Sequence, residues 1–392
     1  MTVTPALGGL VALAAAIGIG RFVYTPILPL MVADLGMTKA TAGVVASANF
    51  AGYLAGALLA ATSLVAGSRR RWLLAGLAAS AVTTGAMGLV SSTGSFLALR
   101  FIGGAASAFG LVFASALVLD ALAAASRPEL SALHFAGVGV GIAVSAVLSA
   151  GLTVLSGGWR SIWLAAGAIS LAAVAIVPTL IPDRAGPSPK AAAADRVIDG
   201  RLAAFVIAYG LFGFGYIITA TFLVAIVRDA RYARAFEPVV WLVVGLTAAP
   251  SVALWTWISR RIGVGRAFAL ACVAEAIGVA ASVMPATSAV LLGAALLGGT
   301  FMGLTALGLI GARGLSRGDP RTTLAMMTAS FGLGQIVGPA FAGLVHDATA
   351  SFALPSLVAV VALLLGALLA VTSLERRGRA GGIVETPPVR TS

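Results

Sequence analysis

Long apolar segments recur along the whole chain and are separated by short polar stretches. Of the 392 residues, 60% are hydrophobic and only 10% are charged, and the mean hydropathy is +1.05. Soluble domains carry about 25% charged residues, so this chain needs lipid as its solvent. Only helices and closed barrels satisfy the backbone in lipid, and these segments are far longer than barrel strands of about ten residues. The sequence therefore predicts an all-α polytopic membrane protein.

The apolar segments divide into twelve expected spans, six on each side of one polar linker. The spans are placed at residues 7–33, 40–66, 72–91, 96–123, 131–155, 161–181, 201–227, 238–258, 266–284, 288–312, 322–345 and 352–373. The linker is rich in proline, alanine and charge. We expect an N-terminal six-helix bundle at 1–181, a cytoplasmic linker at 182–200, a C-terminal six-helix bundle at 201–374 and a cytoplasmic tail at 375–392.

The basic residues indicate how the chain is oriented. With both termini on one side, eighteen of the 25 Lys and Arg residues fall on that side, five fall on the opposite side and two lie inside spans. The positive-inside rule then predicts a multi-pass protein of the cytoplasmic (inner) membrane with both termini in the cytoplasm. The net charge of +12 is thus a topology signal, and we expect no nucleic-acid partner. The single Cys272 argues against a disulfide framework or a cysteine metal site, and no metal or cofactor is expected.

A shift of 195 residues brings the glycine pairs of the two halves into register. Gly18 and Gly20 fall on Gly213 and Gly215, Gly103 and Gly104 on Gly298 and Gly299, and Gly137 and Gly139 on Gly332 and Gly334. The common offset at three separate places predicts a duplicated six-helix unit. Two parallel repeats with a site at their interface, near the middle of the membrane, are a transporter architecture.

Several motifs resemble those of the major facilitator superfamily. They are the Arg100–Gly104 segment, the glycine-rich Gly137–Gly141 and Gly332–Pro339 segments, and Gly158-Trp159-Arg160. The Gly20–Pro29 stretch, together with Asn49–Gly56, resembles the YbfB/YjiJ-type group of that superfamily. The resemblance implies two six-helix halves in which spans 1, 4, 7 and 10 line a central cavity. The loop before Arg69 lacks the acidic residue usual there, which puts the superfamily's cytoplasmic latch in doubt.

A permanently charged residue, Arg21, lies in the middle of the first span. A charge in the hydrocarbon core costs at least about 2.5 kcal/mol on insertion scales, so such a residue is a functional-site hypothesis by default. Its planar fork of donors suits a carboxylate or a phosphate. We predict that Arg21 binds the anionic part of a substrate. The alternative is structural: Arg21 snorkels, or pairs with carbonyl groups that Pro26 and Pro29 leave free.

Three hydroxyl-bearing side chains complete the predicted substrate-binding set. Tyr24 and Thr25 follow Arg21 at three- and four-residue spacing, which places all three on one helical face. Tyr216 is the residue that the 195-residue shift pairs with Arg21. It is a candidate hydrogen-bonding partner for substrate, with core packing as the alternative.

Four further residues are coupling or gating candidates: Arg100, Asp120, Glu275 and His134. The superfamily resemblance associates Arg100 with proton coupling, and a salt bridge or a carbonyl cap is the alternative. Asp120 lies about 30 Å along the same helix, too far to pair with Arg100, and either closes a gate or snorkels. Glu275 is a candidate proton site or a carboxyl that bonds to a neighbouring helix. His134 titrates near neutral pH but has a structural role as its alternative.

Enzyme chemistry is not expected, because the sequence holds no P-loop, no metal-ligand cluster and no paired carboxylates in a cavity. We predict a secondary active transporter that moves a small anionic organic metabolite by alternating access. One alternative is a proton-coupled drug or metabolite efflux pump with an apolar pocket, in which Arg21 is structural. The other is a membrane sensor that binds ligand without transport. The expected partners are a small-molecule substrate, protons as a candidate coupling ion and the lipid bilayer, and a monomer is expected.

Overall fold

The computed structural model describes residues 3–62, 64–183, 199–316 and 320–374. Within these residues the chain is helical and contains no strand. Twelve stretches are long and apolar enough to cross a membrane, which confirms the predicted twelve-helix architecture. Most of the expected linker and the expected tail lie outside the described residues.

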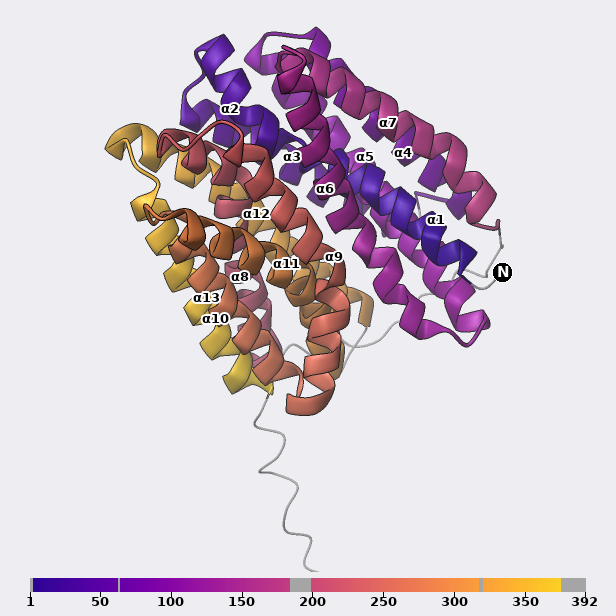
Figure 1. Ribbon diagram of the computed structural model, residues 1–392. Coiled ribbons are helices and arrows are strands. Elements are labelled where there is room, and N and C mark those ends of the chain that lie inside the picture. The colour runs from indigo at the N-terminus through magenta and orange to yellow at the C-terminus, as the bar shows by residue number, and fades with distance from the viewer. Residues whose placement is uncertain (1–2, 63, 184–198, 317–319, 375–392) are drawn as a thin grey trace, which may run out of the picture.

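The twelve spans are built from the helices labelled in Figure 1. The helices are α1 Thr4–Leu13, α2 Tyr24–Leu35, α3 Lys39–Ala60, α4 Arg69–Ala86, α5 Thr93–Ala124, α6 Ser131–Val154, α7 Trp159–Leu180, α8 Gly200–Asp229, α9 Phe236–Ile262, α10 Val264–Ser282, α11 Thr287–Leu315, α12 Pro320–Thr349 and α13 Ala353–Leu374. A π-helix, η1 Ala14–Ile19, joins α1 to α2 in the first span. Two 3-10 turns, η2 Met87–Leu89 and η3 Pro128–Leu130, flank α5.

Short polar side chains begin several of these helices. The side chains of Thr38, Ser68, Ser92 and Asp199 each accept a hydrogen bond from the backbone N–H three residues further on. Such caps satisfy donors that the first helical turn leaves free. At the other end of α2, Gly36 adopts a positive φ of 61°, which ends the helix. These caps lie between apolar segments, so they set where α3, α4, α5 and α8 start.

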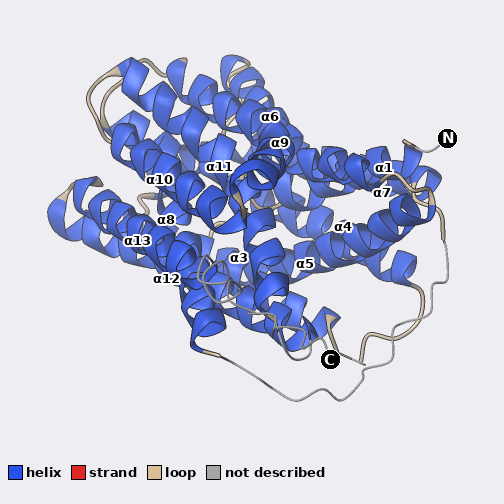
Figure 2. Cartoon of the chain, turned by 90° about the horizontal axis from the view of Figure 1, so that it is seen from below, coloured by secondary structure: helices blue, strands red, loops and turns tan. Residues whose placement is uncertain are grey.

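Two pairs of helices join the first half, α1–α7, to the second half, α8–α13. The pair α3 and α12 lies on one side of the molecule, and the pair α6 and α9 on the other (Figure 2). The 195-residue shift relates span 2 to span 8 and span 5 to span 11, so the two pairs are equivalent. The hydroxyl of Thr25 donates to the carbonyl of Ala220, its own counterpart under this shift, at 2.8 Å. The first and seventh spans therefore meet near the symmetry axis.

The two halves meet toward one end of the bundle, which we call the closed end. It contains the end of α2, the start of α3 and the ends of α8 and α12. At the opposite end, the linker end, α7 ends and α8 begins. There α1 and α5 pack chiefly on helices of the first half, and the two halves diverge in Figure 1.

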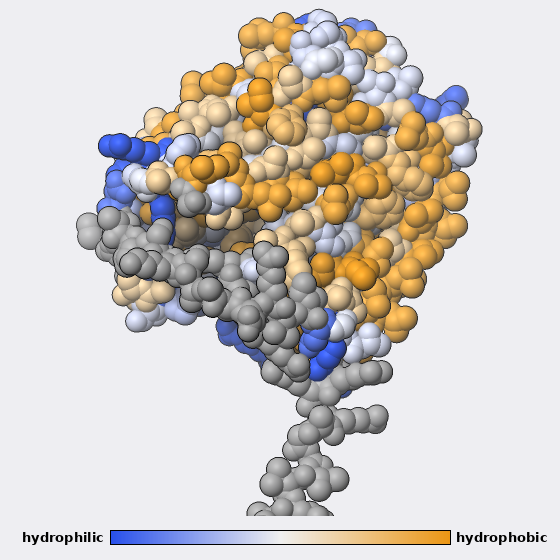
Figure 3. Space-filling model, turned by 180° about the vertical axis from the view of Figure 1, so that it is seen from behind, coloured by the Kyte–Doolittle hydropathy of each residue, from blue (hydrophilic) through white to orange (hydrophobic). Residues whose placement is uncertain are grey.

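The first and seventh spans form the centre of the structure. In their most apolar windows 78% and 83% of the residues are buried, against at most 61% in any other span. The outer spans instead expose large apolar side chains, among them Val147, Leu171 and Leu368. Figure 3 shows apolar residues spread over the flank of the molecule, with hydrophilic ones gathered toward its ends. This surface suits a hydrocarbon solvent, in which packing and small residues hold helices together.

Helices α3 and α5 approach so closely that their contact requires glycine. A Cβ added at Gly104 would overlap the carbonyl oxygen of Asn49, and one added at Gly52 would overlap that of Phe101. In both cases the obstacle is backbone, which cannot swing away as a side chain can. Gly104, one of the glycines matched by the 195-residue shift, therefore has a packing role in the first half.

Replacing Gly104 by alanine should lower the thermal stability of the purified protein. We expect a loss of about 1–3 kcal/mol, because α3 and α5 would have to separate. Gly151→Ala is the matched control, since Gly151 also lies inside a helix and has open space around its Cα. Alanine favours helix by up to about 1 kcal/mol over glycine, so the control should be neutral or stabilising. Thermal unfolding in detergent compares the two, and equal melting temperatures would contradict the packing role.

Candidate functional site

The first span is not a continuous α-helix where it carries Arg21. In the π-helix η1 the N–H of Gly20 donates to the carbonyl of Ala15, five residues back, and the N–H of Phe22 donates to that of Ile17. Residues 20–23 then form a turn before α2 begins. π-bulges of this kind occur frequently at functional sites. The sequence reasoning expected one uninterrupted span and did not predict this irregular segment.

Arg100 of α5 holds the irregular segment together. The N–H of Thr25 donates to Phe22, three residues back, so the carbonyl of Arg21 lacks its ordinary helical donor. Nη1 of Arg100 donates to the carbonyl of Gly20 at 3.2 Å, and Nη2 donates to the carbonyl of Arg21 at 3.2 Å. Irregular backbone is tolerated inside a membrane protein when such groups find partners. The geometry is that of a carbonyl cap.

The side chain of Arg21 is buried without matching partners. Only 6% of the residue is exposed, and its Nε and Nη2 atoms have no hydrogen-bond acceptor among the described residues. Its guanidinium carbon lies 4.0 Å from the ring centroid of Tyr53 and 5.4 Å from that of Phe50, both on α3. Cation–π contact of this kind is worth about 0.5–2 kcal/mol, far less than the cost of burying an unpaired charge. The site is therefore incomplete without an acceptor.

Tyr24 and Thr25 do not converge on Arg21. The Tyr24 hydroxyl donates to the carbonyl of Ala42 at 2.9 Å, and the Thr25 hydroxyl donates to Ala220 of the second half. The expected shared face is lost because the turn at residues 20–23 breaks the helical spacing between Arg21 and Tyr24. Both hydroxyl protons are already used, so of these three residues only Arg21 has donors without an acceptor among the described residues.

Tyr216 belongs to a wall of aromatic rings on the second half. Its ring is nearly parallel to Phe301 of α11, at 5.7 Å and 5°, and to Phe331 of α12, at 5.8 Å and 6°. The amide nitrogen of Gln335 donates to the Tyr216 hydroxyl, while the amide oxygen of this fully buried glutamine has no partner among the described residues. Phe22, the residue after Arg21, lies 5.8 Å from Phe301 between ring centroids. The segment that carries Arg21 therefore lies beside this wall of rings.

The centre of the protein is electropositive. Arg21 and Arg100 are both buried, and neither forms an ion pair with a carboxylate in the described ranges. Two cations in a low-dielectric interior repel each other, and a bound anion relieves that repulsion. The arrangement can therefore bind and orient an anion, with Arg21 supplying the free donors.

Asp120 and His134 lie in the first half, toward the linker end. Asp120 accepts a hydrogen bond from Nη1 of Arg69 at 2.8 Å. Arg69 therefore has an acidic partner on span 4, although the loop that precedes it contains no acidic residue. Nε2 of the buried His134 lies 3.0 Å from the Ser115 hydroxyl, and its ring occupies the space beside Gly9. Neither residue contacts the second half through these bonds. The structure does not bring them together with Arg21.

Glu275 lies in the second half, on α10. It is fully buried, and neither carboxyl oxygen has a hydrogen-bond donor among the described residues. The nearby hydroxyl of Thr300 donates instead to the carbonyl of Leu296 at 2.7 Å. Glu275 remains a candidate coupling residue with no ion-pair partner in the described chain.

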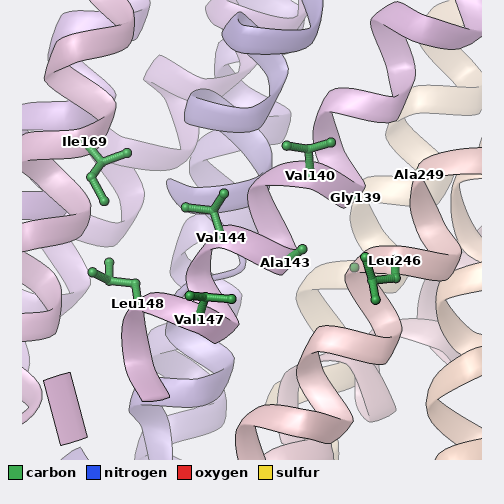
Figure 4. Close-up of a pocket in the computed structure, with 10 residues that line it drawn as sticks. Gly139, Val140, Ala143, Val144, Val147, Leu148, Ile169, Leu246 and Ala249 are labelled. Atoms are coloured by element: carbon green, nitrogen blue, oxygen red, sulfur yellow. The ribbon is translucent and has the colours of Figure 1, made fainter. Parts of the chain in front are cut away.

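An apolar groove lies on the outer side of the α6–α9 contact (Figure 4). Its volume is about 470 Å³, and it is lined by Gly139, Val140, Ala143, Val144, Val147, Leu148, Ile169, Gly245, Leu246 and Ala249. No lining side chain can form a hydrogen bond. The groove therefore lacks the groups that bind an anion, and it is separate from the Arg21 region.

A network of charged residues at the closed end joins the two halves, and the sequence reasoning missed it. Nζ of Lys39 lies 3.0 Å from Asp229 of α8, and Nε2 of His346 lies 3.3 Å from the same carboxylate. The Asp347 carboxylate accepts from the backbone N–H groups of Lys39 and Ala40 at 3.0 and 2.9 Å. Asp347 of the second half thus caps the first turn of α3 in the first half. The sequence predicted that the loops after spans 1 and 7 lie on the same side of the membrane, but it did not predict which of their residues pair.

Twelve spans in two repeat-related halves, with an unsatisfied cation in the middle of the first span, define a polytopic membrane protein with the architecture of secondary transporters. The profile of the family described as uncharacterised MFS-type transporter YbfB matches residues 13–371. The chain belongs to this family, which confirms the resemblance seen in its motifs.

Known proteins share parts of the sequence or the fold. A gallate transporter of Pseudomonas putida is 28% identical over 185 residues, which are 45% of this chain and 41% of that protein. The match thus spans less than half the length of that relative. A point mutant of the nucleoside transporter NupG superposes with a TM-score of 0.74 at 15% identity, covering 95% of this chain and 98% of that one. A bacterial homologue of the human lysosomal transporter Spinster, in an inward-facing and unoccupied conformation, has a TM-score of 0.68 at 16% identity over 95% and 96%.

The two buried arginines should respond oppositely to the same substitution. Arg100→Met removes donors from two buried carbonyls and should cost about 1–3 kcal/mol of stability for each group left unsatisfied. Arg21→Met replaces an unpaired buried charge by an apolar chain of similar length and should be neutral or stabilising. Thermal unfolding of both variants in detergent, without added ligand, measures the difference. Equal destabilisation would mean that Arg21 is structural.

Proposed function

We propose that this protein is a secondary active transporter that moves a small anionic organic metabolite across the cytoplasmic membrane by alternating access. Arg21 receives the anionic group of the substrate between the two halves, and Tyr216 presents the facing wall of the second half. Both termini lie in the cytoplasm, as the distribution of basic residues suggests. The linker end, where the halves diverge, is then the cytoplasmic end.

The observation that carries this proposal is the pair of free donor atoms on Arg21. A buried guanidinium without an acceptor is destabilising by itself, and proteins retain such groups where function needs them. Arg100 is not equivalent, because its Nη1 and Nη2 atoms donate to the carbonyls of Gly20 and Arg21, and only its Nε has no acceptor among the described residues. A carboxylate matches the fork geometry of the remaining donors.

The sequence relative supports the same charge for the substrate. Gallate is an organic acid, and the protein named as its transporter shares 28% identity with part of this chain. We transfer only the coarse chemical class, a small organic anion. The superfamily fold supports the alternating-access mechanism, in which repeat-related halves rock about a central site.

The closed-end network fits the role of a gate in this mechanism. It joins Lys39 of the first half to Asp229 and Asp347 of the second half. Opening of this end would break all of these contacts between the halves. It would not require any change within the helix segment that carries Arg21. The network therefore favours the state in which the site communicates with the linker end.

A second candidate function is a proton-coupled efflux pump for apolar compounds. The observation that favours it is the fully buried Glu275 carboxyl, which has no ion-pair partner in the described residues and is a candidate proton carrier. In that case Arg21 serves structure, and lipophilic cations rather than carboxylates bind. A sensor without transport is the third possibility, and only a transport measurement separates it.

Small carboxylates should stabilise the purified protein, and lipophilic cations should not. We expect acetate, succinate or benzoate to raise the melting temperature in detergent, whereas tetraphenylphosphonium should not raise it. Arg21→Met should weaken carboxylate binding about 10- to 100-fold, because charged hydrogen bonds contribute about 1.5–3 kcal/mol. Titration of the melting temperature with ligand measures the change.

The matched control is Arg261→Met, since Arg261 stacks on Trp257 outside this site. It should leave carboxylate binding unchanged. Stabilisation by tetraphenylphosphonium alone would replace the main proposal by the efflux pump. Counterflow of a bound carboxylate in proteoliposomes would exclude the sensor, and binding without counterflow would establish it.

Weakening the closed-end network should expose the contact between α3 and α12. Ser47 is buried there and donates to the carbonyl of Ile336 at 2.6 Å. In a Cys272→Ser background, a Ser47→Cys reporter should react with a maleimide several-fold faster when Asp347 is replaced by Asn. Neutral asparagine weakens the cap on α3 that holds the end of α12 against it.

The control for this measurement is Asp120→Asn. It breaks the pair with Arg69 at the other end of the bundle, inside one half, and should leave the labelling rate unchanged. If Asp347→Asn also leaves the rate unchanged, the closed-end network is not a gate.

A further inference from the structure

The residues around Arg21 restrict the shape of the substrate as well as its charge. This inference rests on the function proposed above and extends it to the chemical class of the organic anion. Three features of the described residues bear on it: the position of Arg21 on aromatic rings, the wall of parallel rings opposite, and a second buried polar atom without a partner.

The first feature is the way in which Arg21 is packed. Its guanidinium carbon lies 4.0 Å from the Tyr53 ring centroid, so one face of the group rests on an aromatic ring. The N–H bonds of a guanidinium lie in its own plane and point away from its edge. Contact with a ring face therefore uses no donor, and Nε and Nη2 have no acceptor among the described residues. This arrangement receives a planar acceptor, such as a carboxylate, edge to edge.

The second feature is the ring wall of the second half. Tyr216, Phe301 and Phe331 come from three different helices, and the Tyr216 ring lies within 5° of the plane of Phe301 and within 6° of that of Phe331. Phe22, the residue after Arg21, contacts this wall through Phe301 at 5.8 Å between centroids. The wall therefore begins directly beside the irregular segment that carries Arg21. Aromatic pairs gain about 0.5–1.5 kcal/mol beyond the burial of area, which an aliphatic ligand would not gain.

The third feature is the free amide oxygen of Gln335. The residue is fully buried on α12, and its amide nitrogen is bound to the Tyr216 hydroxyl. With the amide in this orientation, its oxygen lies beside the ring wall and has no donor among the described residues. A buried acceptor left unpaired costs about 1–3 kcal/mol, and a hydroxyl group on a ligand would satisfy it.

Together these features describe a site with donors at one end, flat apolar rings along it and an acceptor beside those rings. We propose that the substrate is an aromatic carboxylate that carries a ring hydroxyl. Its carboxylate binds Arg21, its ring packs against the wall of Tyr216, Phe301 and Phe331, and its hydroxyl donates to Gln335. An aliphatic acid would satisfy only the first of these groups.

Three ligands that share one negative charge test the inference on the full-length protein in detergent. They are cyclohexanecarboxylate, benzoate and 4-hydroxybenzoate, and their dissociation constants are measured by isothermal titration calorimetry. We expect benzoate to bind about 2- to 10-fold more tightly than cyclohexanecarboxylate. We expect 4-hydroxybenzoate to bind more tightly again, by a similar factor.

Two variants connect these preferences to the residues that cause them. Phe331→Leu should abolish the preference for benzoate over cyclohexanecarboxylate, and Gln335→Met should abolish the preference for 4-hydroxybenzoate over benzoate. Phe109→Leu is the control, because Phe109 packs on Trp72 and Phe113 within the first half. It should change neither ratio.

The outcomes separate this inference from the proposed function. If all three carboxylates bind equally and lose affinity in Arg21→Met, the anion transporter stands and the aromatic substrate is overturned. Preferences that survive in both Phe331→Leu and Gln335→Met would also overturn it, since another surface would then recognise the ring. If no carboxylate binds at all, the proposed function itself fails. The comparison of ligands on the unmodified protein holds even if a variant does not fold.

Discussion

The hydrogen bonds from Arg100 to the carbonyls of Gly20 and Arg21 are the interaction on which the centre of this protein depends. The first span leaves the α-helical pattern there, and irregular backbone in an apolar interior needs partners for its polar groups. Arg100 supplies them from α5 at 3.2 Å. Because Arg100 already satisfies the carbonyls of this segment, the Nε and Nη2 donors of Arg21 are not needed for them. The two buried charges therefore have different roles, although the sequence presents both as arginines inside apolar spans.

The contacts between the halves determine how this centre can be reached. Between the halves the helices approach through glycine: a Cβ on Gly43 would overlap the carbonyl of Pro339, and one on Gly245 would overlap the backbone of Ala143. Small residues allow the helices to pack closely by van der Waals contact, without a hydrophobic driving force in lipid. The charged network around Asp347 adds directional bonds at the closed end. Packing that is tight but polar at its rim suits an interface that must form and separate.

The sequence was sufficient for the architecture because hydropathy and repeats are properties of the chain itself. Twelve apolar segments, and glycine pairs at one offset, predicted the spans that the structure contains. Arg21 was found by its charge alone. The predicted shared face of Arg21, Tyr24 and Thr25 was wrong, because residues 20–23 form a turn after the π-helix and helical spacing assumes an unbroken α-helix.

Contacts between distant segments were beyond the reach of the sequence for a different reason. Lys39 and Asp347 are 308 residues apart, and no local pattern records that they meet. The same holds for Asp120, which pairs with Arg69 at the start of α4, 51 residues away. Tyr53 was visible as a polar aromatic residue, but only the fold places its ring under Arg21.

The two copies of the repeat carry different side chains at the centre of the protein. The 195-residue shift superposes Arg21 on Tyr216, so the first half presents a cation and the second half presents a ring. Two arginines facing each other across the axis would repel, whereas a cation and an aromatic hydroxyl can approach. A ligand between them meets one charged end and one apolar end. It therefore joins the halves in a way that neither a plain ion nor a plain hydrocarbon can, since each would satisfy only one of the two repeats.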